Sequence, residues 1–323
     1  MSFDAESPAY VFIRWALYLG MMLIVGSVSF AAVAIPVLRR ESGEPEVARA
    51  AEREAACWGF YAALLVTAAA FCRLIAQTLA FYDPSEAFDA GLVQMIVTQT
   101  LWGRAWLLQI AAVAAVLVGL DAARRGIARF GGILGGWGVA LAGTITLALS
   151  SSLSGHAAAD PRLAALAVLL DTMHVLGAGF WLGGLAVVAL VGLRSRPIIL
   201  NGAVVPKHLL PALLKAFAPT ALVGASVVGA TGAFAAWLHL QDVRLLGTSS
   251  YGLRLLVKLV AVAVIVSVGA LNWRRFAPQA GHLRGLRNLR VAVALEVLLG
   301  ALVLLITAIL VATATPDSQT PAS

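Results

Sequence analysis

Residues 163–193 read LAALAVLLDTMHVLGAGFWLGGLAVVALVGL, an apolar run that contains one acidic residue and one histidine. About 20 apolar residues are enough to cross the hydrocarbon core of a bilayer as a helix. The run is continuous and does not alternate, which is typical of a membrane-spanning helix and not of a barrel strand. We therefore expect this stretch to cross a membrane, with length to spare for tilting or protruding.

Seven further stretches share this character, so the sequence predicts an all-α, polytopic integral membrane protein with eight transmembrane helices. Of its 323 residues, 61% are hydrophobic and 12% are charged, against roughly 25% charged in an average soluble protein. This composition excludes a soluble globule and a disordered chain, and two Cys are too few for a disulfide scaffold. The expected spans are Tyr10–Leu38, Ala55–Phe81, Leu101–Leu120, Gly131–Leu153, Leu163–Leu193, Lys215–Leu238, Tyr251–Asn272 and Arg290–Ala312.

The basic residues predict the orientation. Sixteen of the 23 Lys and Arg residues fall in the loops that follow the first, third, fifth and seventh spans. By the positive-inside rule these loops face the cytoplasm, so both termini are expected on the opposite, periplasmic side. The asymmetry explains the net charge of +7, so the expected partner of the basic loops is anionic membrane lipid and not nucleic acid.

We expect one membrane domain over 1–323. Within it, residues 1–130 hold the first three helices, 131–313 hold the other five, and 314–323 form a short polar tail that is predicted to be disordered.

Ionisable residues inside a membrane are costly and by default indicate function. Asp171 and His174 lie in the fifth span, on the helical face that also carries Trp181. An imidazole at this depth is a good ligand for a soft metal, and a carboxylate one turn away can orient it. The alternative is an Asp–His hydrogen bond that only locks helix packing.

Four other side chains can add to such a site. His156 follows the fourth span and His239 closes the sixth, so both are expected in the outer half with His174. Each alone suits a histidine at the lipid–water boundary, but together the three imidazoles suggest a site. Met21 and Met22 lie at about the depth of His174; thioethers and imidazoles suit Cu(I), although Met is also ordinary core filler.

Several cations also fall in the spans, mostly toward the outer half. If they face inward, their field repels a bare cation; they can instead hold heme propionates or pair with Asp171. Glu296, nearer the cytoplasmic end of the last span, has Lys215 or Arg290 as expected partners, or serves as an exit-site carboxylate. The cations in the spans are Arg14, Arg73, Arg104, Arg254 and Lys258.

Short motifs follow one another along the second half of the chain. They include Ser154-Gly155-His156-Ala157, Asp171-x-x-His174, Trp181-x-Gly183-Gly184-Leu185, Thr231-Gly232, Ala236-Trp237-Leu238-His239, Leu255-Leu256-Val257-Lys258, Gly269-Ala270-Leu271-Asn272 and then Glu296. In this order and spacing they resemble the CopD/PcoD family of copper-resistance membrane proteins. The similarity is good over about 145–313 and looser over the first four helices.

The resemblance implies a bacterial inner-membrane protein, not an enzyme, that takes up copper from the periplasm, often beside a CopC-like periplasmic carrier. Any such carrier is expected to be a separate chain. On the matching positions, His156, His174 and His239 would bind copper with Asp171 in support. Trp181, Lys258 and Glu296 would support or gate the path.

Two other functions stay open at this point, and so does the oligomeric state. A heme-binding membrane redox protein would use His174 and His239 as axial ligands. A scaffold would deliver copper to another protein without transporting it.

Overall fold

The computed structural model describes residues 7–42, 45–82, 88–127, 135–155, 163–194, 198–200, 203–205, 209–240, 244–272, 274 and 283–313. Within these ranges eight helical spans are long and apolar enough to cross a membrane, which confirms the all-α polytopic prediction. The fifth span is made of three consecutive elements. The spans are α1 (Pro8–Ser42), α2 (Pro45–Phe81), α4 (Leu101–Arg124), α5 (Gly136–Leu153), α6 (Ala164–Ala178) with the π-helix η3 (Gly179–Gly183) and α7 (Gly184–Arg194), α8 (Leu209–Leu240), α10 (Ser250–Leu271) and α11 (Leu283–Ala312).

Short elements that the sequence analysis did not predict lie between the spans. The helix α3 (Ala90–Gln99) begins where the Asp89 carboxylate accepts hydrogen bonds of 2.9 and 3.0 Å from two backbone N–H groups, which is a typical N-cap. The helix α9 (Leu245–Thr248) precedes α10. An antiparallel hairpin of β1 (Ile198–Leu200) and β2 (Ala203–Val205) lies outside the spans and leaves the fold class unchanged.

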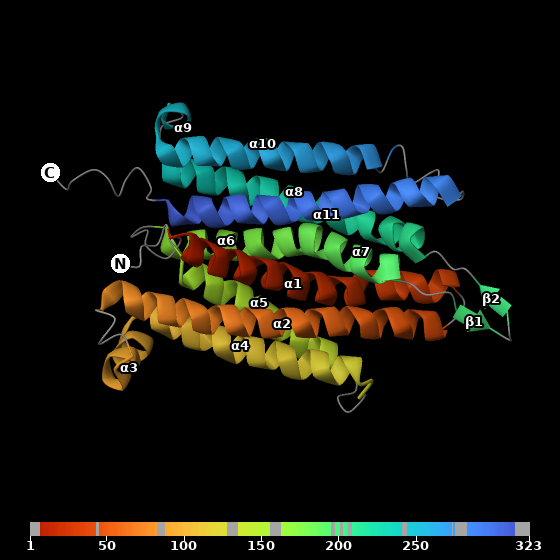
Figure 1. Cartoon of the computed structure of the whole chain (residues 1–323), viewed down its shortest axis with the longest axis horizontal. Coiled ribbons are helices and arrows are strands. Elements are labelled where there is room, and N and C mark those ends of the chain that lie inside the picture. The colour runs from red at the N-terminus through yellow and green to blue at the C-terminus, as the bar shows by residue number, and fades with distance from the viewer. Residues whose placement is uncertain are drawn as a thin grey trace.

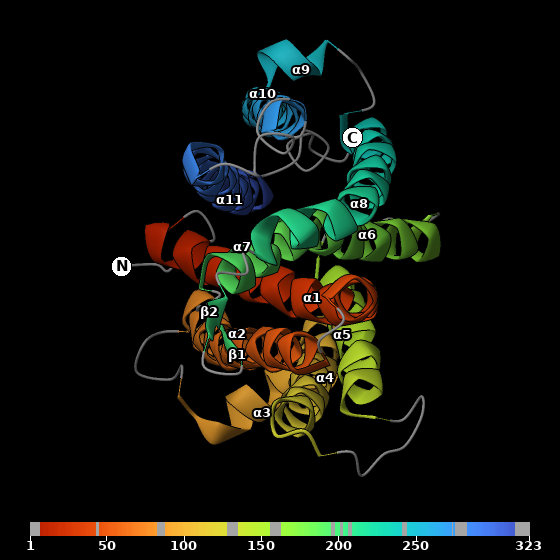
Figure 2. The ribbon, with the colours of Figure 1, turned by 90° about the vertical axis from the view of Figure 1, so that its right-hand side faces the viewer.

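The first helix, α1, is the centre of the bundle. It contacts α2, α5, α6, η3, α7, α8 and α11. Seen from the end of the bundle, α2, α4 and α5 lie on one side of α1, and α8, α10 and α11 lie on the other (Figure 2). Because the number of spans is even, α1 begins at the same end of the molecule at which α11 ends (Figure 1).

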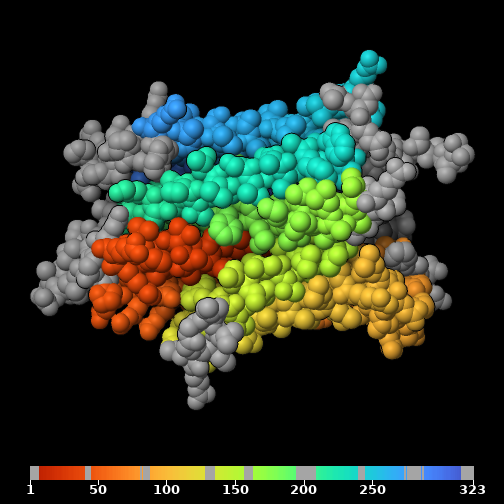
Figure 3. Space-filling view, turned by 180° about the vertical axis from the view of Figure 1, so that it is seen from behind, coloured from red at the N-terminus to blue at the C-terminus, as the bar shows by residue number. Residues whose placement is uncertain are grey.

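Glycines bring the fifth span unusually close to α1. A side chain on Gly183 would collide with the backbone oxygen of Met22, and one on Gly26 would collide with that of Gly183. The contact lies at η3, where the helix widens into a π-helical turn; such turns are frequent at functional sites. On the other face, α8 runs along α6 and α7 (Figure 3), so the fifth span is held between α1 and α8.

Candidate functional site

His174 is oriented by a hydrogen bond across two helices. It lies ten residues into α6, or about 15 Å along the axis, and its Nδ1 is 2.9 Å from Thr231 Oγ1 on α8. The Thr231 hydroxyl already donates its one hydrogen to the Val227 backbone oxygen at 2.6 Å. With the hydroxyl hydrogen on Val227, Oγ1 accepts from His174 Nδ1–H and the lone pair lies on Nε2; this is the tautomer that we adopt.

Thr231 is a site residue that the sequence analysis missed. Thr231 is the residue bonded to Nδ1, and the supporting role expected of Asp171 stays a prediction. Gly232, the next residue, leaves space beside the ring: a Cβ there would stand 3.4 Å from His174 Cε1. The dipeptide Thr231-Gly232 stands out in an apolar span and was the available signal for a site residue. The sequence does not indicate that His174 is the residue Thr231 contacts.

One charged group, on a neighbouring helix, acts on this imidazole. Lys258 of α10 acts electrostatically on His174, and Asp171 acts in turn on Lys258. Asp171 also acts on the Tyr18 hydroxyl of α1, together with Arg14 and Arg73. His174 and Asp171 are thus both within electrostatic range of Lys258, and a single site formed by the three residues stays a prediction.

The outer arginines face other helices. Arg14 donates to the Ala308 backbone oxygen at 3.5 Å and lies over the Tyr10 ring at 4.7 Å. Arg73 donates to Ser154 Oγ at 3.3 Å, and Arg254 donates to the Thr313 hydroxyl. Their guanidinium groups tie α1, α2 and α10 to neighbouring elements, and they contribute a positive field in this part of the bundle.

The convergence of three histidines stays a prediction. His156 lies outside the described residues, and His239 lies in α8 but its side chain is not described. The backbone of His239 is eight residues beyond Thr231 toward the outer end of α8, or about 12 Å along the axis. Among the described side chains, no group of three or more His, Cys, Asp or Glu stands close enough to hold a metal ion.

The predicted thioether ligands lie in the hydrophobic core. Met21 and Met22 are 1% and 6% exposed and belong to one buried cluster with Trp181 and Leu182. The Met22 backbone packs against Gly183, nine residues or about 13 Å along the helix from His174. A ligand role for either Met, and a gating role for Trp181, stay predictions.

Glu296 has a different partner from those expected. Its Oε2 accepts a hydrogen bond of 2.9 Å from Asn272 Nδ2, and both residues are buried. This amide, and not Lys215 or Arg290, is the observed contact of the carboxyl group. The pair lies between α10 and α11, at the C-terminal end of α10.

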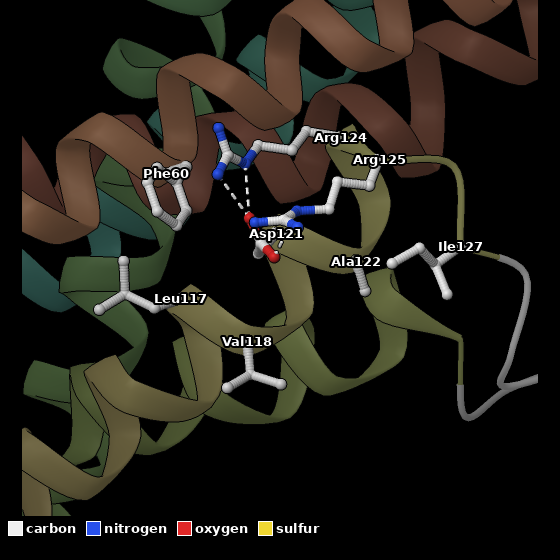
Figure 4. A pocket seen from close by; sticks show the side chains of 8 residues that line it. All are labelled: Phe60, Leu117, Val118, Asp121, Ala122, Arg124, Arg125 and Ile127. Atoms are coloured by element: carbon white, nitrogen blue, oxygen red, sulfur yellow. Dashed lines mark hydrogen bonds and ion pairs between the residues drawn. The ribbon is translucent and has the colours of Figure 1, made fainter.

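An open cavity of about 590 Å³ lies between α2 and the C-terminal end of α4. This is the end of the bundle that carries the loops rich in Lys and Arg, and we call it the basic end. Asp121 stands there between Arg124 and Arg125, with ion pairs of 2.5 and 2.8 Å (Figure 4). The Arg124 guanidinium lies 4.1 Å from the centre of the Phe60 ring. Because the carboxylate is already neutralised, this cavity offers no ligand set for a metal, and it contains none of the predicted site residues.

The fold and the site define a class of protein: a multi-pass membrane protein with a histidine hydrogen-bonded between two of its helices. The family model for the copper resistance protein D-like N-terminal domain matches residues 4–165, and the model for copper resistance protein D matches residues 211–310. The chain belongs to the copper resistance protein D family, and it is a membrane protein of copper homeostasis.

Two relatives illustrate the similarity. Copper resistance protein D of Pseudomonas syringae pv. tomato is 26% identical over 312 residues, which cover 93% of this chain and 94% of that protein. Copper transport protein CutJ of Bacillus subtilis (strain 168) is 28% identical over 189 residues, which cover 58% of this chain but only 33% of CutJ. Both names are those of copper resistance or transport proteins and not of enzymes. No solved structure matches this chain.

Proposed function

We propose that the protein takes up copper from the periplasm into the cytoplasm through a site around His174. The observation that carries the proposal is the bond from His174 Nδ1 to Thr231, which presents the Nε2 lone pair to a ligand. A neutral imidazole held by a second hydrogen bond is the form in which histidine binds soft metal ions. Copper is the cargo here, and the ligand chemistry favours Cu(I).

The orientation follows from the charges. The loops that carry most of the Lys and Arg face the cytoplasm, both termini face the periplasm, and the membrane is the bacterial inner membrane. A separate CopC-like carrier brings copper to the periplasmic end, where His156 and His239 receive it. Copper then passes inward to His174, and Met21 or Met22 adds a soft ligand when the helices rearrange.

Asp171 has an electrostatic task in this scheme. Arg14, Arg73 and Lys258 make the outer half positive, which opposes the entry of a cation. Asp171 acts on Lys258 and supplies the negative charge that offsets it. The carboxylate therefore lowers the electrostatic cost of placing copper next to His174.

The heme alternative is less well supported by the geometry. Two axial histidines must meet at the same depth on facing helices. At the depth of His174 the facing residue on α8 is Thr231, and His239 lies about 12 Å farther out along that helix. In the scaffold alternative the protein binds copper and hands it to another protein, but it does not itself move copper across the membrane.

Purified full-length protein in proteoliposomes tests the proposal. With Cu(I) outside and a chromophoric Cu(I) chelator inside, we expect a chelator signal that exceeds that of protein-free vesicles. Copper that binds to the protein without entering the lumen would instead favour the scaffold. A Soret band at one heme per chain in the same sample would favour the redox protein.

Replacing Thr231 by valine should weaken copper binding with little change in shape. Valine keeps the volume but removes the acceptor for His174 Nδ1–H, and loss of such a supporting partner typically costs about 10–100-fold in metal affinity. We expect a loss of at least about tenfold for Thr231→Val and near-normal affinity for Thr231→Ser, which restores the hydroxyl. Competition with a chromophoric Cu(I) chelator measures both, and equal affinities for the wild type and Thr231→Val would remove Thr231 from the site.

A further inference from the structure

Glu296 and Asn272 form a buried polar pair that the copper site does not use. Glu296 is 8% exposed, and its carboxyl group is bonded to the Asn272 amide at the end of α10. Gly269 makes room for it, because a Cβ at this position would stand 2.8 Å from Glu296 Oε1. The contact between α10 and α11 is thus built around a carboxyl group, although an apolar side chain would pack there at far lower cost.

Among the side chains that the structure describes, no cation balances the charge of this carboxyl group. In the part of the chain that the structure describes, the polar group that acts on Glu296 is the Asn272 amide. Arg287 and Arg290 precede Glu296 on α11 by nine and six residues, so they are turned to other sides of that helix. Lys258, the cation on the same face of α10, is 14 residues from Asn272, or about 21 Å along the axis.

The other helices packed against α11 are α1 and α7, and no cation whose side chain the structure describes on them lies at this level; the side chain of Arg194, the last residue of α7, is not among the described ones. Arg14 of α1 reaches Ala308, which is 12 residues, or about 18 Å, beyond Glu296. At the other end of α1, Arg39 is paired with Glu52 at 2.8 Å. Between Gly184 and Leu193, α7 has no charged residue.

An apolar barrier separates this pair from the copper site. Ile265 lies midway between Lys258 and Asn272 on one face of α10 and is 1% exposed. Ile265 and Leu182 of η3 converge on Gly300, where a Cβ would stand 3.6 and 3.4 Å from their methyl groups. Lys258 and the inner carboxyl group therefore lie on opposite sides of a packed layer, and one side of this layer is the π-helical turn.

The basic end offers a route to the inner carboxyl group. An open cavity of about 600 Å³ lies between the end of α10 and the start of α11, and Asn272, Arg287 and Asn288 line it. Asn272 lines this cavity and also bonds to Glu296. A proton that enters this cavity would thus be one side chain away from the carboxyl group.

From this arrangement we propose that Glu296 carries a proton across the barrier: it takes up the proton from the cavity on the cytoplasmic side and releases it on the periplasmic side when the helices rearrange, so that one proton moves outward as one Cu(I) ion moves inward. A carboxylate is a hard oxygen ligand and a poor match for Cu(I), but buried carboxyl groups are the usual proton carriers of transporters. The Asn272 amide holds Oε2 and leaves Oε1 to take the proton. The coupling rests on the proposed copper transport, whereas the protonation itself does not.

Infrared difference spectroscopy of the full chain in lipid nanodiscs, titrated with pH and without copper, tests the protonation. We expect a carboxylic-acid C=O band that appears on acidification, shifts in D₂O, is lost in Glu296→Gln and persists in Glu46→Gln, whose exposed carboxyl group serves as the control. Glutamine still accepts the Asn272 hydrogen bond, so the variant keeps the packing. The same band in Glu296→Gln would overturn the assignment.

Proteoliposomes with a pH dye inside test the coupling. In the wild type, copper entry should be accompanied by proton movement that falls to the level of protein-free vesicles in Glu296→Gln, while this variant still binds copper as tightly as the wild type. Copper entry without proton movement in the wild type would overturn the coupling. Absence of any copper entry would count against transport and would leave the infrared result to decide the proton site.

Discussion

Cells that produce His174→Ala should show no copper uptake above that of cells lacking the protein, with normal amounts of the variant in the membrane. The reason is local: His174 is the one imidazole in the described structure whose lone pair is oriented, by Thr231, toward a ligand. Alanine removes the metal-binding atom but keeps the helix, since alanine has the highest helix propensity. Cellular copper content after a pulse of copper measures the effect.

A second histidine variant serves as the control. His208 lies in the basic loop between the fifth and sixth spans, and His208→Ala removes an imidazole of the same kind from outside the bundle. It should leave uptake unchanged. Normal uptake by His174→Ala would remove the fifth span from the mechanism.

Gly183→Ala should disrupt the bundle itself. The added methyl group would meet the Met22 backbone oxygen, and a helix backbone cannot move aside as a flexible side chain can. Overpacking of a tight core typically costs about 1–3 kcal/mol, occasionally more. We therefore expect a clear fall in the thermal unfolding midpoint in detergent, or loss of the monodisperse peak in size-exclusion chromatography.

Gly229→Ala is the matched control for this change. Gly229 lies in α8, and a Cβ there would meet no atom within 4 Å. In a helix interior, alanine is favoured over glycine by about 1 kcal/mol, so this variant should be as stable as the wild type or more stable. If Gly183→Ala matched Gly229→Ala in stability, the close approach of α1 and η3 would be wrong.

The sequence predicted the membrane spans because their signal is local. A run such as 163–193 is long and apolar, and no tertiary contact is needed to recognise it. The expectation that Asp171 and His174 share one helical face was equally local, since it rests only on their spacing of three residues. The π-helical turn within the same run was not predicted, because its residues are as apolar as the rest of the helix.

The partners across helices could not be predicted in this way. Thr231 is 57 residues from His174 and Glu296 is 24 residues from Asn272; both pairs depend on which helices are neighbours and at what relative height. Charge matching suggested Lys215 or Arg290 for Glu296, but the structure satisfies the carboxyl group with an amide. The pair forms beside Gly269 because this residue has no side chain and so leaves space for the Glu296 carboxyl group.

X-ray absorption of the full-length protein loaded with one equivalent of Cu(I) tests the central claim most directly. If His174 Nε2 binds copper, the extended fine structure of the wild type should contain the multiple scattering of an imidazole ring, and this contribution should decrease in His174→Ala. The same spectrum in both proteins, or copper surrounded by sulfur and oxygen alone in the wild type, would contradict a copper site at His174.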